Sequence, residues 1–238
     1  TPGLALSTAS GAILSDNDPR FTLQPKEAFL ALDFDGLRAA IGDRLAAGAI
    51  ELALVGDLDE DAAIAAVAAT LGALPQREPA FNPRTENRTR SFTATRGERV
   101  ITHKGEPDQA LLQWVWPTTD DSDVTEDLRL SLLARIVRLE LTDRLREELG
   151  QAYSPSAGSN TSHFYQGYGT FTISASVAAD QAEATRKAVA GLIADLRAGP
   201  LDADVVERAR KPILEEYKNV LKDLGGWIGL AARAQSEP

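Results

Sequence analysis

Two side chains near the middle of the chain could act together as hydrogen-bond donors. The stretch RLREELGQAYSPSAGS, residues 144–159, carries Arg146 in a charged run and Tyr153 shortly after a glycine. A guanidinium and a phenol both donate hydrogen bonds and keep their protons at neutral pH. Acidic residues lie three and four positions from these arginines, a spacing typical of solvent-exposed ion pairs on a helix. Such pairs stabilise a helix by only a few tenths of a kcal/mol. On composition alone, Arg146 is a surface arginine and Tyr153 a half-buried strand aromatic.

Other chemical signatures are scarce. The two histidines, His103 and His163, lie far apart in the sequence, and there is no HxxEH, HExxH or HxH pattern that would predict a zinc site. We interpret both as surface or edge residues. The absence of cysteine excludes disulfides, thiolate metal ligands and a cysteine nucleophile. There is also no GxSxG serine motif and no glycine-rich phosphate loop.

The elements around Arg146 and Tyr153 are predicted clearly. Residues 123–149 give the longest helical signal of the chain, with apolar residues on two stripes, and Gly150 ends it. Two strands follow, over 152–162 and 164–178. The second is expected to face a core with its alternating apolar residues, Phe171, Ile173, Ala175 and Val177. Arg146 is therefore expected on the end of a helix, and Tyr153 at the start of a strand.

The first third of the chain predicts a helix, a strand and a second helix. The first helix is expected over Phe34–Ala47, where Gly48 stops it, and IELALVGD at 50–57 is typical of a short strand. Asp59 or Asp61 can cap the second helix, over 59–74. Acidic residues at a helix start suit the helix dipole, so we favour caps over a cation site for VGDLDED.

The remaining segments complete an alternating pattern. Residues 76–90, rich in proline, asparagine and arginine, are interpreted as a linker. Strands are expected over 91–105 and 109–118, the latter ended by Pro117, with Trp114 and Trp116 on one face. Two helices close the chain, separated by a turn at 199–200. This order predicts an α+β fold with a mostly antiparallel sheet flanked by helices.

Charge and hydropathy exclude several classes of partner. The 238 residues carry a net charge of −10, with a pI near 4.8, which argues against nucleic acid and anionic membranes as partners. Apolar runs fall far short of the roughly 20 residues that a membrane span requires. The N-terminal residues do not match a signal peptide. The compartment stays open, and would be periplasmic or cytoplasmic if the source is bacterial.

Two motifs carry a resemblance to a known family. LTDRLREELGQAYSPSAGS followed by GYGTFTISASV resembles the C-terminal-domain signature of the pitrilysin/insulinase family of zinc metallopeptidases, in which arginine and tyrosine stand seven residues apart. Arg146 and Tyr153 match that pair. IELALVGDLDEDAAIAAVAATLGALP is similar to the family's segment before the interdomain linker. The two motifs occur in the family's order and cover most of the chain.

The resemblance implies a clam-shaped peptidase built of homologous α+β domains. One half would carry HxxEH and the catalytic zinc, and the other would carry Arg146 and Tyr153 as donors to substrate carbonyls near the scissile bond. The substrate would be an extended peptide that adds to a sheet edge. By this pattern residues 1–75 complete a preceding domain, and residues 91–238 form the domain with the arginine and tyrosine. Residues 76–90 are the linker between these two domains.

The chain departs from a whole family member because it lacks HxxEH and so cannot bind the catalytic zinc. In one hypothesis it is a fragment of a zinc peptidase and is inactive alone. In another it is a non-catalytic subunit or structural partner of a zinc-bearing chain. A peptide-binding module is a third reading, since an exposed sheet edge binds extended chains without cutting them. Such an edge could also pair two copies into a homodimer.

Overall fold

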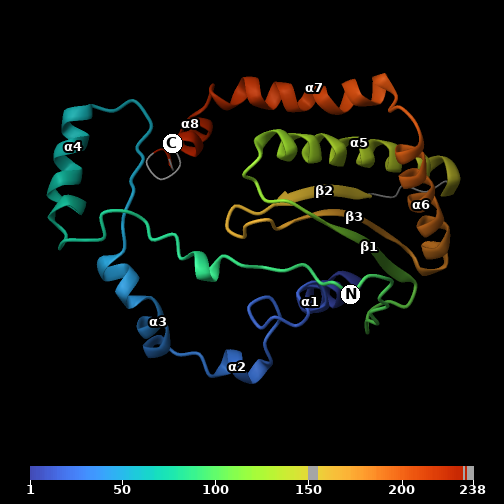
Figure 1. The fold of residues 1–238 in the computed structure, drawn as a ribbon, viewed down its shortest axis with the longest axis horizontal. Coiled ribbons are helices and arrows are strands. Elements are labelled where there is room, and N and C mark those ends of the chain that lie inside the picture. Colours follow the sequence, from blue (N-terminus) through green and yellow to red (C-terminus); the bar gives the residue numbers. More distant parts are fainter. Residues whose placement is uncertain (150–154, 233, 235–238) are drawn as a thin grey trace. The chain divides into compact units, whose positions relative to one another are not determined.

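The computed structural model describes residues 1–149, 155–232 and 234 (Figure 1). The chain divides into two compact units. The first comprises Thr1–Gln24 and Thr85–Ile213, and the second comprises Pro25–Arg84 and Leu214–Pro238. Each unit is therefore built from segments that are distant in sequence.

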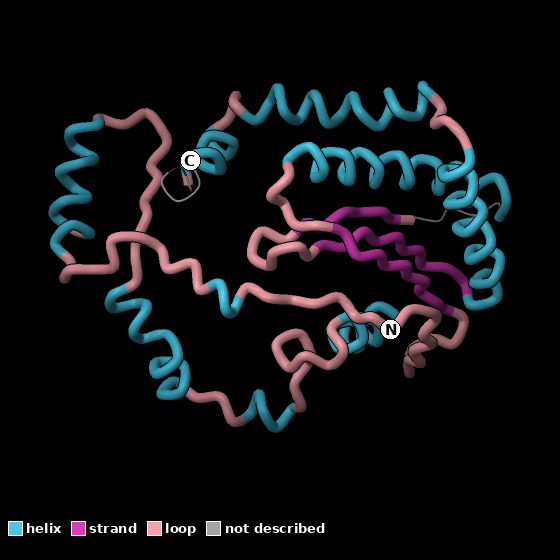
Figure 2. The backbone as a smooth tube through the Cα atoms, viewed as in Figure 1, coloured by secondary structure: helices cyan, strands magenta, loops and turns pink. Residues whose placement is uncertain are grey.

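An antiparallel three-stranded sheet forms the centre of the first unit (Figure 2). Its strands are β1 (Gln109–Thr118), β2 (Ser156–Thr161) and β3 (Gly169–Ala178), in the order β1-β3-β2. β3 pairs with β1 along its whole length and with β2 over the part nearer its start. The predicted α+β fold with an antiparallel sheet is confirmed.

Helices α5 (Val124–Leu149) and α6 (Ala182–Ala198) bury one face of this sheet. The alternation along β3 places its odd-numbered apolar residues in the core, as predicted. A continuous stripe of α5 packs against them, joined by three residues of α6. The core cluster consists of Ala134, Val137, Leu141, Leu145, Phe171, Ile173, Ala188, Val189 and Leu192. This cluster fixes the end of α5 from which Arg146 projects.

The first unit also contains elements at its periphery. α1 (Pro2–Leu14) begins at Thr1, whose hydroxyl accepts from Leu4 N at 3.4 Å, and was not predicted from the sequence. Short 3₁₀ turns occur at Thr85–Asn87 (η2) and Ala179–Gln181 (η3). α7 (Ala203–Val220) starts in this unit, where its Ala209 is buried. No helix in the described ranges is long and apolar enough to cross a membrane.

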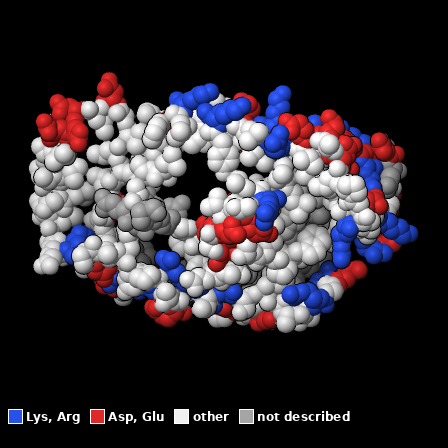
Figure 3. Space-filling view, turned by 45° about the horizontal axis from the view of Figure 1, so that its top comes forward, with Lys and Arg blue, Asp and Glu red and all other residues white. Residues whose placement is uncertain are grey.

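The second unit consists of short helices joined by irregular segments. They are α2 (Lys26–Leu30), α3 (Phe34–Ala47), α4 (Glu60–Ala69), η1 (Leu71–Ala73) and α8 (Leu224–Ala231). The predicted bounds of α3 are confirmed. Asp59 caps α4 as expected, since its carboxylate accepts from Ala62 N at 3.0 Å. Acidic residues are close together in the sequence at the start of α4, at Asp57, Asp59, Glu60 and Asp61. Figure 3 shows several groups of acidic side chains, drawn in red, on the surface of the chain.

The first residues of the predicted linker cap the C-terminus of α3. The Arg77 guanidinium donates to four carbonyls at the end of α3, those of Arg44, Leu45, Ala46 and Gly48, at 2.7–3.3 Å. Glu78 N donates to Ala47 O at 2.8 Å. Helix ends need such partners for their last carbonyls. This part of the linker is therefore bound to α3 within the second unit.

Several strand predictions are wrong. Residues 50–57 and 91–105 alternate like strands but belong to none in this structure. A strand exists only where a second strand supplies its hydrogen bonds, and alternation does not say where that second strand is. Pro117 does not end β1, which continues to Thr118, because proline is tolerated on an edge strand when its nitrogen faces away from the sheet.

The sequence predicts one long helix over 201–235, after the turn at 199–200, but the described residues there form two helices. α7 ends at Val220, and α8 begins after Asp223, whose carboxylate accepts from Gly226 N at 2.8 Å. The capping aspartate starts a new helix rather than continuing the old one. The two glycines that closely follow it in the sequence are weak helix formers, which also favours a break.

Candidate functional site

Arg146 lies on the last turn of α5, beside two of the best-buried residues of the chain. Leu141 and Leu145 are both fully buried, four residues apart on the core-facing side of the helix. Arg146 follows Leu145, so its side chain leaves the helix about 100° away from that side and is exposed. The negative end of the helix dipole favours an arginine there. The core thus fixes the backbone of Arg146 and leaves its guanidinium in solvent.

Arg144 and Arg146, on either side of Leu145, have different surroundings. Arg144 Nη2 donates to Asp195 Oδ2 of α6 at 2.5 Å, and the Arg144 side chain is only 24% exposed. Gly191 of α6 leaves room for it, since a Cβ there would lie 2.8 Å from Arg144 Nη1. By contrast, no hydrogen bond or ion pair in the described part of the chain engages the Arg146 side chain. Arg144 joins two helices, whereas Arg146 has its donors available.

The solvated pair that sequence spacing suggested for Arg146 does not form. Asp143, three residues before it, lies instead 4.0 Å from Arg208 of α7. Both of those side chains are about half exposed, so their ion pair contributes little. The arginine that the family resemblance singled out is therefore not neutralised by this neighbour.

Tyr153, the other predicted site residue, lies outside the described residues, which omit 150–154. The structure therefore does not give the distance between Arg146 and Tyr153. The chain is described again from Pro155, which is buried, and β2 starts at Ser156. Ser156 Oγ and Ser174 Oγ of β3 lie 2.7 Å apart, which ties the start of β2 to the sheet. The segments on both sides of 150–154 are thus held against the core.

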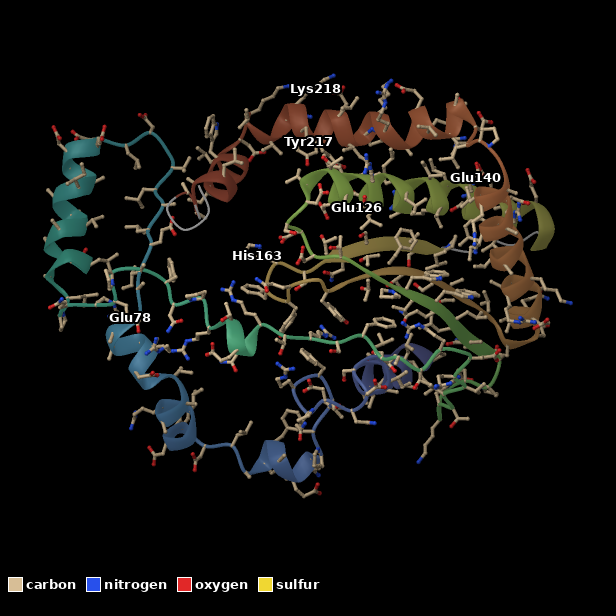
Figure 4. The ribbon with its side chains drawn as sticks, in the orientation of Figure 1. Glu78, Glu126, Glu140, His163, Tyr217 and Lys218 are labelled. Carbon is tan, nitrogen blue, oxygen red and sulfur yellow. The ribbon has the colours of Figure 1, made fainter. Side chains whose placement is uncertain are left out.

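The two histidines hold turns in place. His163, labelled in Figure 4, lies between β2 and β3, and its Nδ1 is 2.9 Å from Asp121 Oδ2. His103 Nδ1 accepts from Gly105 N at 3.1 Å, which leaves Nε2 as the donor to Gln109 O at 3.0 Å. Among the described residues, no three His, Cys, Asp or Glu side chains gather as a metal site would require. The residues present do not fit a catalytic zinc.

The Asp120 carboxylate connects the β2–β3 turn to the segment before α5 through hydrogen bonds from Ser122 and Gly167, here called the clasp. Asp120 Oδ1 accepts from the Ser122 hydroxyl at 2.5 Å, and Oδ2 accepts from Gly167 N at 2.5 Å. These donors, the Ser122 hydroxyl first, hold the pKa of Asp120 below its usual range because they stabilise the ionised carboxylate. Gly167 has a φ of +66°, a left-handed conformation that favours glycine. The clasp fixes the turn that contains His163.

One cluster escaped prediction entirely. The Arg90 guanidinium carbon lies 3.9 Å from the ring centre of Phe21 and 4.2 Å from that of Tyr168, with Tyr165 at 5.7 Å. Stacking of this kind stabilises by cation–π attraction. The only signal in the sequence was an arginine-rich run, and nothing in it identified ring partners as remote as Phe21. The cluster holds the loop after α1 and the β2–β3 turn together.

Comparison with protein families finds one matching family model, whose description is the peptidase M16 inactive domain, over residues 31–213. That range is more than half of the chain. Among curated proteins, no sequence matches.

Solved structures share the fold. A peptidase M16 inactive domain from Pseudomonas fluorescens aligns over 100% of this chain at 22% identity, with a TM-score of 0.68. The ferredoxin protease FusC, solved in complex with Arabidopsis ferredoxin, aligns over 99% at 13% identity, with a TM-score of 0.69. A predicted insulinase family protease from Yersinia pestis aligns over 77% at 16% identity, with a TM-score of 0.51. At these identities the likeness is one of fold.

This chain is shorter than the proteins it resembles. It spans 58% of the Pseudomonas chain, 25% of the FusC chain and 40% of the Yersinia chain. The family resemblance of its two motifs is nevertheless confirmed by the family model, which begins ahead of the first motif and runs past the second. The chain belongs to the peptidase M16, or insulinase, family, and corresponds to the domain of that family described as inactive.

Proposed function

We propose that this chain supplies the substrate-binding half of a peptidase active site. In this proposal Arg146 and Tyr153 donate hydrogen bonds to backbone carbonyls of an extended peptide, beside a zinc site on another domain of the same protein or of a partner chain. The observation that carries the proposal is the exposed Arg146 guanidinium, which nothing in the described chain engages, on a helix end held by buried leucines. Family membership supplies the context.

The chemistry of the two side chains suits this role. When a peptide carbonyl is attacked, negative charge develops on its oxygen, and a fixed donor stabilises that charge more than it stabilises the ground state. A guanidinium stays positive at any physiological pH, and a phenol hydroxyl stays protonated at neutral pH. Both can therefore donate throughout a reaction without exchanging protons with the substrate. A helix end with its backbone fixed is well suited to hold such a donor.

The domain organisation of the proposal follows the family pattern. Residues 1–75 complete a preceding homologous domain, 76–90 connect, and 91–238 form the domain with Arg146 and Tyr153. The zinc belongs to the domain that carries HxxEH, because the described residues of this chain do not fit it. Peptides or proteins are the proposed substrate class, and a protein substrate is named for one structural neighbour, the ferredoxin protease.

A second candidate is a non-catalytic subunit that binds extended peptides or supports a zinc-bearing chain. Two observations favour it: the matched family model is that of an inactive domain, and no described strand pairs with the outer edges of β1 and β2. Such edges bind extended chains by strand addition. The two candidates differ in whether Arg146 and Tyr153 affect turnover or binding alone.

The test compares variants in the complete protein with its zinc-bearing domain. Arg146→Ala and Tyr153→Phe should each lower kcat by about 10²-fold, the loss expected for one donor to a developing oxyanion. Loss of peptide affinity with unchanged kcat would favour the non-catalytic candidate. Wild-type kcat and affinity in both variants would exclude both roles for the pair.

The chain alone provides a complementary test. We expect the 238 residues to bind an unstructured peptide weakly and not to cleave it, with or without added zinc, because they lack a zinc site among the described residues. Binding can be measured by fluorescence anisotropy and cleavage by mass spectrometry of the peptide. Zinc-dependent cleavage by the isolated chain would contradict the proposal.

A further inference from the structure

The turn of α5 that ends at Arg146 points its side chains in four directions. Successive residues of an α-helix lie about 100° apart around the axis, so Asp143, Arg144, Leu145 and Arg146 go once around it. The first three contact three different parts of the first unit, namely α7, α6 and the core cluster. Arg146, in the fourth direction, is exposed. The turn is thus attached on three sides and presents its fourth side to solvent.

The two polar attachments of this turn differ in strength. Asp143 Oδ2 and Arg208 Nη2 of α7 are 4.0 Å apart, and both side chains are about half exposed. Arg144 Nη2 donates to Asp195 Oδ2 of α6 at 2.5 Å, and the Arg144 side chain is largely covered. A short hydrogen bond between charged groups, one of them partly buried, is stronger than a solvated pair at the limit of contact. Arg144 therefore provides the main polar attachment of the turn.

α6 lies beside the end of α5 (Figure 1) and provides a fitted place for the Arg144 guanidinium. Gly191 and Asp195 are four residues apart and so lie on the same side of α6. A Cβ on residue 191 would lie 2.8 Å from Arg144 Nη1, so the glycine lets the guanidinium approach the helix. Leu192, next to that glycine, belongs with Leu145 to the core cluster. The glycine and the carboxylate thus hold Arg144 on a helix that the core already fixes.

The attachment of Arg144 bears on the direction of Arg146. Leu141 and Leu145 hold α5 against the core from one side, but apolar contacts are non-directional and resist rotation about the helix axis only weakly. An ion pair in a second direction, about 100° away, resists that rotation. Arg144 and Arg146 are two residues apart, which is about 200° around the helix. With Arg144 held toward α6, Arg146 is directed to almost the opposite side.

A small rotation of this turn would displace the donors of Arg146 appreciably. Side-chain ends lie about 5–6 Å from the axis of a helix, so a rotation of about 10° moves them by about 1 Å. A misplacement of about 1 Å can lower the rate of a reaction by as much as about 10²-fold. A donor to a developing oxyanion must therefore be held in its direction as well as in its position along the helix.

We propose that Arg144 is a positioning residue, which sets the direction of Arg146 through its ion pair with Asp195. Arg144 touches no substrate in this proposal, because its guanidinium is bound to α6 on the side of α5 away from Arg146. It acts through the backbone of the last turn of α5. The inference rests on the proposed function of Arg146 and adds to it the pair of residues that keeps the Arg146 guanidinium aligned.

Charge reversal at Asp195 tests the proposal in the complete protein with its zinc-bearing domain. Asp195→Lys places two positive charges together and displaces Arg144, so kcat for peptide cleavage should fall by about 5–10-fold. The loss is smaller than that expected for Arg146→Ala, because the Arg146 guanidinium is still present. Asp195 is exposed, so the variant should fold. Wild-type kcat in Asp195→Lys, with the loss retained in Arg146→Ala, would overturn the inference and leave the proposed function standing.

Exchange of the two charges should restore the lost activity. Arg144→Glu together with Asp195→Lys places opposite charges across the two helices again, and should return kcat to within about twofold of the wild type. Arg144→Glu alone should lower kcat as Asp195→Lys does. Failure of the double variant to recover would show that the two charges do not act through their pairing, which would overturn the proposal.

A matched control breaks an ion pair that stays within α6. Arg186 Nη2 lies 2.7 Å from Glu183 Oε1, and both side chains are about half exposed. Arg186→Ala removes a charge from the same helix without breaking its attachment to α5, so kcat should stay at the wild-type value. A fall in kcat as large as that in Asp195→Lys would show that kcat responds to any change of charge on α6, and would contradict the proposal.

The Arg146→Ala background separates positioning from a general effect on the fold. That background has no guanidinium at position 146 to direct, so adding Asp195→Lys should not lower kcat further. The cost of Asp195→Lys in stability, measured by urea unfolding, should be the same in both backgrounds. An equal fold-loss of kcat in both backgrounds would show that Asp195 acts independently of Arg146, which would overturn the inference. Wild-type kcat in Arg146→Ala alone would instead overturn the proposed function, and the inference with it.

Discussion

The two units of the chain differ in how far they bury their own apolar residues. Every buried side chain in the described residues belongs to the first unit, where α5, α6 and the sheet share one core. The second unit has equally clear apolar patterns, but Phe34 is 83% exposed and Leu52 is 45% exposed. An apolar pattern in the sequence therefore predicts that a segment packs against something, but it does not show that the packing partner belongs to the same unit.

The segment at 50–55 illustrates this lesson. Ile50, Leu52 and Leu54 alternate with less exposed residues, as in a strand with one face toward a core. In the described chain this segment joins no sheet. In the proposed domain organisation, residues 1–75 complete a preceding domain, and this exposed face would pack within that domain.

The largest expected effect separates the two units by stability. Leu141→Ala removes a fully buried side chain from the first core and should lower the free energy of unfolding by about 2–5 kcal/mol. The matched variant Leu52→Ala in the second unit should change it by less than about 0.5 kcal/mol, since Leu52 is exposed. Urea unfolding followed by circular dichroism measures both. A cost for Leu52→Ala as large as that for Leu141→Ala would remove the contrast between the units.

An intermediate effect is expected from ion pairs. Arg144→Ala breaks the contact between α5 and Asp195 of α6 and should cost about 0.5–1 kcal/mol. Arg38→Ala, in the second unit, breaks a pair with Asp35 whose side chains are 79% and 92% exposed, and should cost nothing measurable. Thermal unfolding of the two variants in low and high salt measures the difference. Identical melting temperatures for both variants would show that the Arg144 contact contributes no stability.

The smallest expected effect concerns pH. The pKa of Asp120 is lower in the folded chain than its usual value of about 3.9, so its clasp stabilises the fold above that value. The contribution should be lost as pH falls below about 4 and through the lower folded pKa. Asp120→Asn should therefore reduce the loss of stability of the first unit between about pH 5 and pH 3. An unchanged pH profile in Asp120→Asn would mean that the clasp does not contribute.

The sequence predicted helices well where local residues determine their ends. α3 has the predicted bounds because Asp33 caps it and Gly48 follows it, and α4 starts after its predicted cap, Asp59. α5 was equally clear, since its apolar stripe needs only residues of the same helix to be recognised.

Strands were predicted well where a partner strand lies close in the fold, as for β1, which pairs with β3 over its predicted range. β3 lies between two strands and shows its buried alternation plainly. Residues 50–57 and 91–105 show similar alternation but have no strand partner in the described chain. The break before α8 was missed although Asp223 carried a capping signal, because the apolar pattern continued past it.

The site was accessible from sequence only in part. Spacing and the family resemblance identified Arg146. They did not predict that Arg144, two residues earlier, forms an ion pair with Asp195. That contact joins residues 51 positions apart, and no local pattern predicts it. The stacking of Arg90 on Phe21 was missed for the same reason.

The most direct test of the central claim is the ratio kcat/KM of two arginine variants in the complete protein with its zinc-bearing domain. Arg146 and Arg138 are both exposed on α5, and neither side chain has a hydrogen bond or ion pair among the described residues. We predict that Arg146→Ala lowers kcat/KM for peptide cleavage by about 10²-fold, while Arg138→Ala leaves it unchanged and both unfold like the wild type. Wild-type kcat/KM in Arg146→Ala would contradict the account.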